Sequence, residues 1–229
     1  MKTVASPMTE ATPYDTLVER YARMSHTFAP RPVDRVIRVF DVLLAAIGLV
    51  VTSPLMGVCA LAVRLSGSHG VLYRGARAGK GGAVFTMLKF RTLKPHAEAR
   101  IGPFYGQELT RLTEAEQTRV GQILRATKLD ELPQLWNVLR GEMSIVGPRP
   151  IRPLFFEELA QEIPAYWQRL VVRPGITGFA QLRLTREMTW AEKLAHDFEY
   201  IADRSLRLYF EIIGQTLLIV VSPSRRPQG

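Results

Sequence analysis

The sequence predicts an α+β protein, in which a small mixed domain of helices and short strands follows one N-terminal membrane helix. Three observations support this prediction. The 22 residues from Val42 to Val63 carry no charge, and about 20 apolar residues suffice to cross a bilayer. Residues 71–93 contain two runs typical of a β-hairpin. Beyond residue 106, most of the longer segments have the apolar spacing of helices.

The chain is basic and has enough apolar residues for a core. Its 229 residues include 30 Lys and Arg against 21 Asp and Glu, and 47% are hydrophobic, which suits one domain with an attachment. This charge balance suggests an anionic partner: nucleic acid, an anionic membrane surface or a phosphorylated substrate. The single cysteine, Cys59, excludes an internal disulfide. The four scattered histidines offer no paired spacing for zinc.

Ser53-Pro54 lies near the middle of the uncharged run, which is too long and too far from Met1 for a signal peptide. A proline inside a helix removes a backbone hydrogen bond and favours a kink, and a nearby serine hydroxyl can satisfy the freed carbonyl. Positive charge favours the cytoplasmic face, and arginines flank the run on both sides: Arg31, Arg35, Arg38, Arg64, Arg74 and Arg77.

Charge alone therefore leaves two arrangements equally open. The helix either spans the bilayer with a kink, or it is re-entrant and leaves by the face it entered. A buried core helix of a soluble protein is a third and weaker alternative, because the run is apolar on all sides. Asp41, directly before the run, could pair with a neighbouring arginine at the interface.

We divide the chain into a polar N-terminal segment (1–33), the membrane helix (34–66), a mixed domain (67–221) and a tail (222–229). Tyr14 to Met24 could form a short surface helix. In the mixed domain we expect strands at 71–74, 83–91, 144–146 and 179–184, and helices at 107–126, 131–140, 153–171 and 190–221. We expect the helical region at 190–221 to be in two pieces. Its apolar end is too short to cross a membrane, so we expect that end to lie against the membrane or the core.

The basic turn at 75–82, G-A-R-A-G-K-G-G, resembles a phosphate-binding loop of nucleotide hydrolases. That motif has four residues between its glycines and a Ser or Thr after its lysine. Here only three residues separate Gly75 from Gly79, and Gly81 follows Lys80. A strand, not a helix, comes next. We therefore interpret the turn as a basic hairpin loop that faces anionic lipid.

Asp130 and Glu131 begin a helix with a stripe of leucines, and Pro133 is tolerated only in its first turn. Anions are favoured at such a helix N-terminus. Two interpretations follow. Asp130 is an ordinary N-cap that accepts amide hydrogens, or the two carboxylates hold Mg²⁺ while one of them attacks a phosphorus. Arg125 lies five residues upstream and could pair with phosphate oxygens.

Three further basic positions could hold phosphates. Strand alternation places Lys89 and Arg91 of K-F-R-T-L on one face. Arg149 lies between two prolines, which restrict its backbone and present its guanidinium at low entropic cost. R-P-G-I-T-G, at 173–178, is a second rigid basic turn. Each could be a solvated face or an incidental turn, but with the carboxylate pair they look like a phosphate cradle.

The chain resembles the bacterial sugar transferases, the monotopic phosphoglycosyl transferases that act on polyprenyl phosphate. The resemblance covers residues 34–221, and four motifs carry it: S-P at 53–54, K-F-R-T-L at 89–93, P-G-I-T-G at 174–178, and L-R-x₄-D-E-L-P-Q-L-W-N-V-L-x-G-E-M-S-I-V-G-P-R-P at 124–150. With few residues ahead of this region, the chain looks like a minimal form of the family.

The resemblance implies a re-entrant helix broken at Ser53-Pro54 and amphipathic interfacial helices. It places the protein at the bacterial cytoplasmic (inner) membrane, with the catalytic domain (67–221) facing the cytoplasm. It also implies Mg²⁺ and a two-step reaction. Asp130 would attack the β-phosphate of a UDP-sugar and release UMP, and undecaprenyl phosphate would then take the phosphosugar. The implied site residues are Asp130 and Glu131 for catalysis and metal binding, and Lys89, Arg91, Arg125, Pro148, Arg149, Pro150, Arg173 and Asp197 for substrate binding.

The sequence also departs from the family pattern. Many relatives have W-A-Q-V-N-G-R after P-G-I-T-G, but this chain has Phe179 and no N-G-R, and Lys128 replaces a Ser or Thr before the carboxylates. The sugar, the pathway and a homo-oligomeric state are therefore left open. An inactive basic scaffold that binds anionic membrane lipids is the alternative function. Nucleic-acid binding is disfavoured, because the basic residues are not interleaved with stacking aromatics.

Overall fold

The computed structural model describes residues 31–67, 70–101, 106–183 and 188–221. The expected surface helix at 14–24 and the tail at 222–229 lie outside the described residues. The mixture of helices and short strands confirms the predicted class. The elements follow in this order: α2 (Pro32–Leu65), β1 (Leu72–Ala78), η2 (Lys80–Gly82), β2 (Val84–Phe90), α3 (Ala97–Ile101), α4 (Gly106–Ala115), α5 (Arg119–Thr127), η3 (Leu129–Glu131), α6 (Gln134–Arg140), β3 (Ser144–Val146), α7 (Pro153–Glu162), η4 (Pro164–Val171), β4 (Gly175–Thr177), α8 (Phe179–Arg183), α9 (Trp190–Asp203) and α10 (Leu206–Val221).

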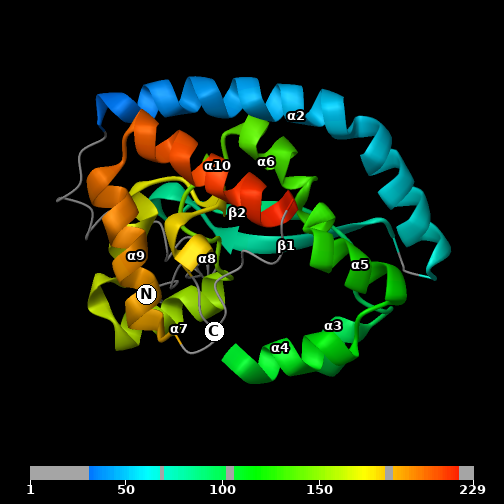
Figure 1. The fold of residues 1–229 in the computed structure, drawn as a ribbon. Helices are drawn as coiled ribbons and strands as arrows, with labels where there is room; N and C mark the ends of the chain where they lie inside the picture. The colour runs from blue at the N-terminus through cyan, green and yellow to red at the C-terminus, as the bar shows by residue number, and fades with distance from the viewer. Residues whose placement is uncertain (1–30, 68–69, 102–105, 184–187, 222–229) are drawn as a thin grey trace, which may run out of the picture.

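The apolar run lies within α2, a single helix that is not interrupted at Ser53-Pro54. Because Pro54 has no N–H, it cannot donate to the carbonyl of Val50, and the Ser53 hydroxyl donates to that carbonyl at 2.8 Å instead. The helix therefore continues through the proline. Figure 1 shows its first part passing over α10 and α6, and its second part turning away and descending beyond α5. The predicted break is thus a curve and not an interruption.

Much of the apolar surface of α2 is left uncovered. The side chains of Val50 and Val51 are 74% and 70% exposed, and Val58 and Leu61 are also exposed. Among the described residues, α2 is the one helix that is long and apolar enough to cross a membrane. A core helix of a soluble protein would not leave these side chains open to water, so that third alternative has no support in the structure.

The N-terminal half of α2 is fastened to the domain by polar side chains on one face. Asp34 pairs with Arg204 at 2.6 Å, and Arg38 donates to the carbonyls of Val138 and Leu139 at the end of α6, at 2.6 and 2.9 Å. These two positions and Asp41 are spaced by four and three residues, which places them on one side of the helix. α2 and the domain are thereby held in one orientation.

Asp41 makes the most buried of these contacts. Its side chain is 1% exposed, and its Oδ1 accepts hydrogen bonds from Ser144 Oγ, Ile145 N and the Tyr209 hydroxyl, each at 2.9 Å. We expected Asp41 to pair with an arginine at the interface. It instead joins α2 to the start of β3 and to α10, because the tertiary fold brings three donors to it.

Two small sheets form the β part of the domain. β1 and β2 make the predicted antiparallel hairpin, in which Tyr73 is opposite Lys89. β3 and β4 pair in parallel, although the segment of β4 was predicted as a turn. Between them the chain backbones approach so closely that a Cβ on Gly147 or Gly175 would overlap the other segment. Only glycine fits at these two positions.

Two predicted helices have other boundaries, and a third helical region agrees with its prediction. The helix expected at 107–126 is divided, because Thr118 caps α5 through a 2.9 Å bond from Gly121 N. The helix expected at 153–171 is also divided: α7 ends before Pro164, and the 3₁₀ helix η4 follows. The helical conformation is unfavourable for a residue that precedes a proline. The helical region at 190–221 is in two pieces, α9 and α10, as predicted.

The strand expected at 179–184 is wrong, because residues 179–183 form the helix α8. The amides of Gln181 and Leu182 both bond to the carbonyl of Gly178, which starts a helical turn. Leu182 is buried in a cluster with Tyr200 and Tyr209. The need to bury this leucine against α9 and α10 therefore outweighs the alternation of the sequence.

We expect Asp41→Ala to lower the free energy of unfolding by about 3 kcal/mol or more, because it leaves three buried donors without an acceptor. Asp41→Asn keeps one oxygen acceptor and should cost less. Thermal unfolding in detergent would measure both, with the exposed Asp203→Ala as the matched control. Equal midpoints for Asp41→Ala and Asp203→Ala would contradict this account of the junction.

Candidate active site

The two adjacent carboxylates lie in a tight turn between two helices. α5 ends at Thr127, and Lys128 follows in the left-handed conformation, with φ of 62°. The turn η3 then carries Asp130 and Glu131, and α6 begins only after Pro133. The reversal at Lys128 turns the chain back, so that η3 packs beside β2. The carboxylates therefore precede α6 and are not part of it, contrary to the predicted helix at 131–140.

The hypothesis that Asp130 is an ordinary helix cap is wrong. The residues in the cap positions of η3 and α6 are Lys128 and Pro133, and neither provides a capping side chain. Asp130 is 6% exposed, yet within the described residues its carboxylate accepts no hydrogen bond. Its oxygens therefore remain available to a ligand.

Glu131 is held by two cations. Lys89 Nζ lies 2.7 Å from Glu131 Oε1, and an Arg149 guanidinium nitrogen lies 3.5 Å from the same oxygen. Burial by itself would raise the pKa of Glu131, but the charges of Arg149 and Lys89 and the hydrogen bond from Lys89 lower this pKa to about 2. Glu131 is therefore ionised at neutral pH.

Asp130 has the opposite electrostatic character. Burial raises the pKa of Asp130, and the negative charge of Glu131 adds to that increase, whereas Lys89, Arg125 and Lys128 oppose it. A carboxylate that is costly to ionise and poorly solvated is a better nucleophile than one that is firmly paired. The two neighbouring side chains are thus suited to different roles.

Arg125 is fixed beside this pair by a side chain of the K-F-R-T-L segment. Its Nε donates to Thr92 Oγ1 at 3.0 Å. Burial lowers the pKa of Arg125 and the charge of Asp130 raises it, but a guanidinium stays charged in either case. Arg125 therefore supplies a permanent positive charge near Asp130, and its predicted contact with phosphate oxygens stays a prediction.

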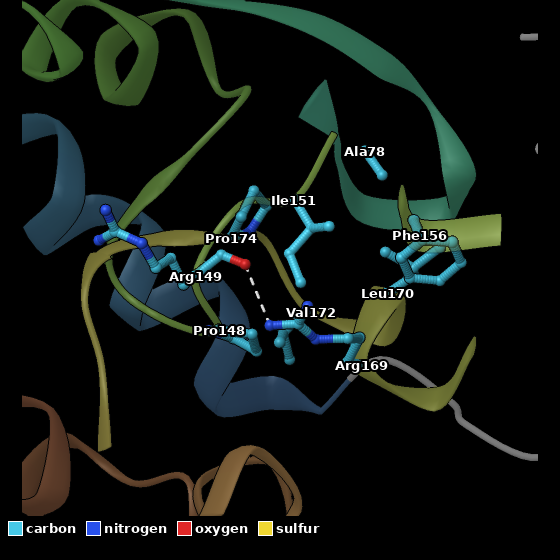
Figure 2. Close-up of a pocket in the computed structure, with 9 residues that line it drawn as sticks. All are labelled: Ala78, Pro148, Arg149, Ile151, Phe156, Arg169, Leu170, Val172 and Pro174. Atoms are coloured by element: carbon cyan, nitrogen blue, oxygen red, sulfur yellow. Dashed lines mark hydrogen bonds between the residues drawn. The ribbon is translucent and has the colours of Figure 1, made fainter. Parts of the chain in front are cut away.

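The G-P-R-P segment, at 147–150, lies at the end of β3 and brings Arg149 to Glu131. The amide of Gly147 bonds to the carbonyl of Thr177, and the amide of Gly175 bonds to the carbonyl of Pro148, both at 2.9 Å. Pro148 and Arg149 also line a small pocket (Figure 2). The Arg149 side chain is 53% exposed, so its remaining donors can reach a ligand from solvent.

Three predicted substrate-binding residues make contacts elsewhere in the domain. Arg91 donates to the carbonyl of Leu72 at 3.4 Å. Arg173 donates to the carbonyl of Gly141 at 2.8 Å, at the end of α6 opposite to the carboxylates. Asp197 is buried and pairs with Arg169 at 2.8 Å. A direct role for these three in substrate binding stays a prediction.

Sequence reasoning missed two residues of this region. Thr92, which fixes Arg125, lies inside the K-F-R-T-L motif, and its hydroxyl could have been noted there. Arg169, which contacts Asp197 and the carbonyl of Arg149, belongs to no motif. An arginine among the apolar residues of 163–172 was the only signal, and it does not reveal a partner that is 20 residues away.

The carboxylate pair offers two hard oxygen ligands for a divalent ion. Among the described residues, no group of three or more His, Cys, Asp and Glu side chains could hold a metal. Mg²⁺ commonly uses one or two protein carboxylates and completes its coordination with water and substrate phosphates. Asp130 and Glu131 therefore fit Mg²⁺ that binds together with a phosphorylated ligand, and they do not form a complete cage.

Comparison with known proteins agrees with this arrangement. A family model described as bacterial sugar transferase matches residues 33–223. A UDP-glucose:undecaprenyl-phosphate glucose-1-phosphate transferase of Caulobacter vibrioides is 40% identical over 185 residues, which cover 79% of this chain and 67% of that protein. The exopolysaccharide production protein ExoY of Sinorhizobium fredii is 35% identical over 202 residues, 83% of this chain and 88% of that protein.

A third relative is longer. A UDP-N-acetylgalactosamine-undecaprenyl-phosphate N-acetylgalactosaminephosphotransferase of Aeromonas hydrophila is 36% identical over 197 residues. The match covers 84% of this chain but only 45% of that protein. The chain therefore spans less than half the length of this relative and most of the length of ExoY.

We expect the stabilising effect of Glu131 to depend on pH. Because the folded-state pKa is about 2 and the ordinary value is 4.5, ionised Glu131 contributes about 3 kcal/mol above pH 4.5, and this contribution is lost as the pH falls towards 2. The difference in unfolding free energy between the wild type and Glu131→Gln should therefore shrink between pH 5 and pH 2. The exposed Glu162→Gln is the control. A difference that stays constant over this range would contradict the paired state of Glu131.

Proposed function

The chain belongs to the bacterial sugar transferase family, and from this premise we propose that it transfers a sugar-1-phosphate from a UDP-sugar to undecaprenyl phosphate. The reaction would initiate the assembly of an exopolysaccharide, capsule, O-antigen or glycoconjugate. One observation carries the proposal: the buried carboxylate of Asp130, which accepts no hydrogen bond from the described residues, lies next to the paired carboxylate of Glu131, among Lys89, Arg125 and Arg149.

In the proposed first step, an Asp130 carboxylate oxygen attacks the β-phosphorus of the UDP-sugar. The bond from that phosphorus to the bridging oxygen breaks, and UMP leaves with the bond electrons. The phosphosugar is then attached to Asp130 as an acyl phosphate. Arg125 and Arg149 offset the negative charge of the diphosphate, which otherwise repels the attacking carboxylate.

In the second step, an oxygen of undecaprenyl phosphate attacks the same phosphorus. The bond to Asp130 breaks, the carboxylate is regenerated, and a lipid-linked diphosphate sugar forms. Mg²⁺, held by Asp130 and Glu131, would supply positive charge to the phosphate oxygens. Glu131 keeps its negative charge throughout, because Lys89 and Arg149 hold its pKa far below neutral pH.

A lipid acceptor requires a site at the membrane surface. We propose that α2 enters the bacterial cytoplasmic membrane, curves near Ser53-Pro54 and leaves by the cytoplasmic face, so that the domain stays in the cytoplasm. Arginines on both sides of the apolar run favour this arrangement. The exposed apolar side chains of α10 would also contact lipid: Phe210, Leu217, Leu218 and Val220.

An inactive membrane scaffold is the alternative function. It would bind anionic lipids through its basic surface and would release no UMP from any UDP-sugar. The sugar itself stays open, because the relatives named above differ in the sugar that their names state. The oligomeric state also stays open.

Asp130→Asn should abolish UMP release from a panel of UDP-sugars in the presence of Mg²⁺ and undecaprenyl phosphate. A wild-type protein incubated with donor alone should carry a phosphosugar at residue 130, which mass spectrometry can detect. Asp203→Asn, which changes an exposed aspartate, is the control and should keep full turnover. Turnover by Asp130→Asn would refute the nucleophile, and no turnover by the wild type with any donor would favour the scaffold.

Topology is tested by single cysteines at two exposed positions on either side of the apolar run, Arg35→Cys and Arg74→Cys, in a Cys59→Ala background. In a re-entrant arrangement both cysteines lie on the cytoplasmic side, so a membrane-impermeant thiol reagent should label both in inverted vesicles and neither in intact cells. Labelling of one position from each side would show a spanning helix.

A further inference from the structure

We infer that Arg169 is a positioning residue for Arg149, and that Asp197 acts on the site through Arg169 and does not touch the substrate. This inference rests on the proposed transferase function. It assigns a role to Arg169, which no sequence motif indicated, and it changes the role expected for Asp197 from substrate binding to the support of one loop.

The guanidinium of Arg169 joins three parts of the domain. Arg169 lies in η4 and is 5% exposed. Its Nη2 donates to the carbonyl of Arg149 at 3.0 Å and lies 2.8 Å from Asp197 Oδ2 on α9, while its Nη1 donates to the Tyr166 hydroxyl at 2.8 Å. Figure 2 shows the Arg149 carbonyl directed at Arg169, whereas the Arg149 guanidinium points away to the other side.

The carbonyls of the 147–151 segment explain why this contact matters. The Pro148 carbonyl accepts from Gly175 N, and the Ile151 carbonyl accepts from Ala78 N, both at 2.9 Å. Both donors are backbone amides of neighbouring strands. The carbonyl of Arg149 accepts from a side chain, that of Arg169. The orientation of the peptide at Arg149 therefore depends on Arg169.

The flanking prolines make the arrangement sensitive to this one bond. Pro148 and Pro150 have fixed φ angles, and a residue before proline is confined to extended conformations. The main backbone freedom left at Arg149 is the rotation about its own φ, which moves its carbonyl and its side chain together. When Arg169 holds that carbonyl on one side, the Arg149 side chain is directed to the other side, where it approaches Glu131 at 3.5 Å.

Asp197 is poorly placed to hold a substrate. Its side chain is 6% exposed and is engaged by Arg169. A ligand would have to displace a buried ion pair to reach it, which is strongly unfavourable because both charges would lose their partner. Its role in the structure is to fix the guanidinium that supports Arg149.

A double-mutant cycle tests the inference. In UMP release assays, Arg169→Gln should lower kcat by about 10- to 100-fold, because a small displacement of a positioned group has effects of this size. Asp197→Asn in the Arg169→Gln background should cause no further loss, since both residues act through one contact. Multiplicative losses from the two changes would show that Asp197 has an independent role and would overturn the inference.

The single variant Asp197→Asn provides a second test in case Arg169→Gln does not fold. An asparagine keeps an oxygen acceptor for Arg169, so kcat should fall by less than about tenfold and KM should be unchanged. A marked rise in KM would indicate direct contact with substrate. The exposed pair Arg100 and Glu116, 2.6 Å apart, provides the matched control as Arg100→Gln/Glu116→Gln.

One measurement separates this inference from the proposed function. Hydrogen exchange of a peptide covering residues 144–152 should be faster in Arg169→Gln/Asp197→Asn than in the wild type and the control. If the wild type released no UMP, the proposed function would fail, but this exchange measurement would still decide whether Arg169 holds the loop. Unchanged exchange would overturn the inference, whatever the activity.

Discussion

A single buried carboxylate determines how the long apolar helix α2 meets the domain. Asp41 accepts three hydrogen bonds, from the start of β3 and from α10. A buried carboxylate without partners is very costly, so α2 must keep the orientation that supplies these donors. Since β3 leads directly into the 147–150 segment, the same contact fixes where Arg149 lies relative to α2. In a membrane, it would fix the depth of the site.

The carboxylate pair shows how one tight turn can give neighbouring residues different chemistry. Glu131 faces Lys89 and Arg149 and stays ionised, whereas Asp130 is buried with no hydrogen-bond partner among the described residues. The turn that follows Lys128 places the two carboxylates in different surroundings. An arrangement of this kind separates a group that keeps charge from a group that reacts.

Cations reach this pair from distant parts of the sequence: Lys89 from β2, Arg125 from α5 and Arg149 from the end of β3. Two of them are held by a further contact, so the cluster does not depend on flexible side chains alone. Thr92 holds Arg125, and Arg169 holds the backbone of Arg149. The repulsion within a group of like charges is thus balanced by fixed geometry and by Glu131.

The sequence by itself determined the local features: the apolar helix, the hairpin, the two-part helical region at 190–221 and the motif residues Asp130, Glu131, Lys89, Arg125 and Arg149. These depend on periodicity, turn residues and short spacing, which are readable along the chain. It misjudged residues 179–183 and the partner of Asp41, and it did not indicate the contacts that Arg173 and Asp197 make within the protein. Only the tertiary structure decided those, because burial of Leu182 and the pairing of buried charges depend on segments far apart in sequence. A pattern of residues shows which groups need a partner, but folding decides which partner is within reach.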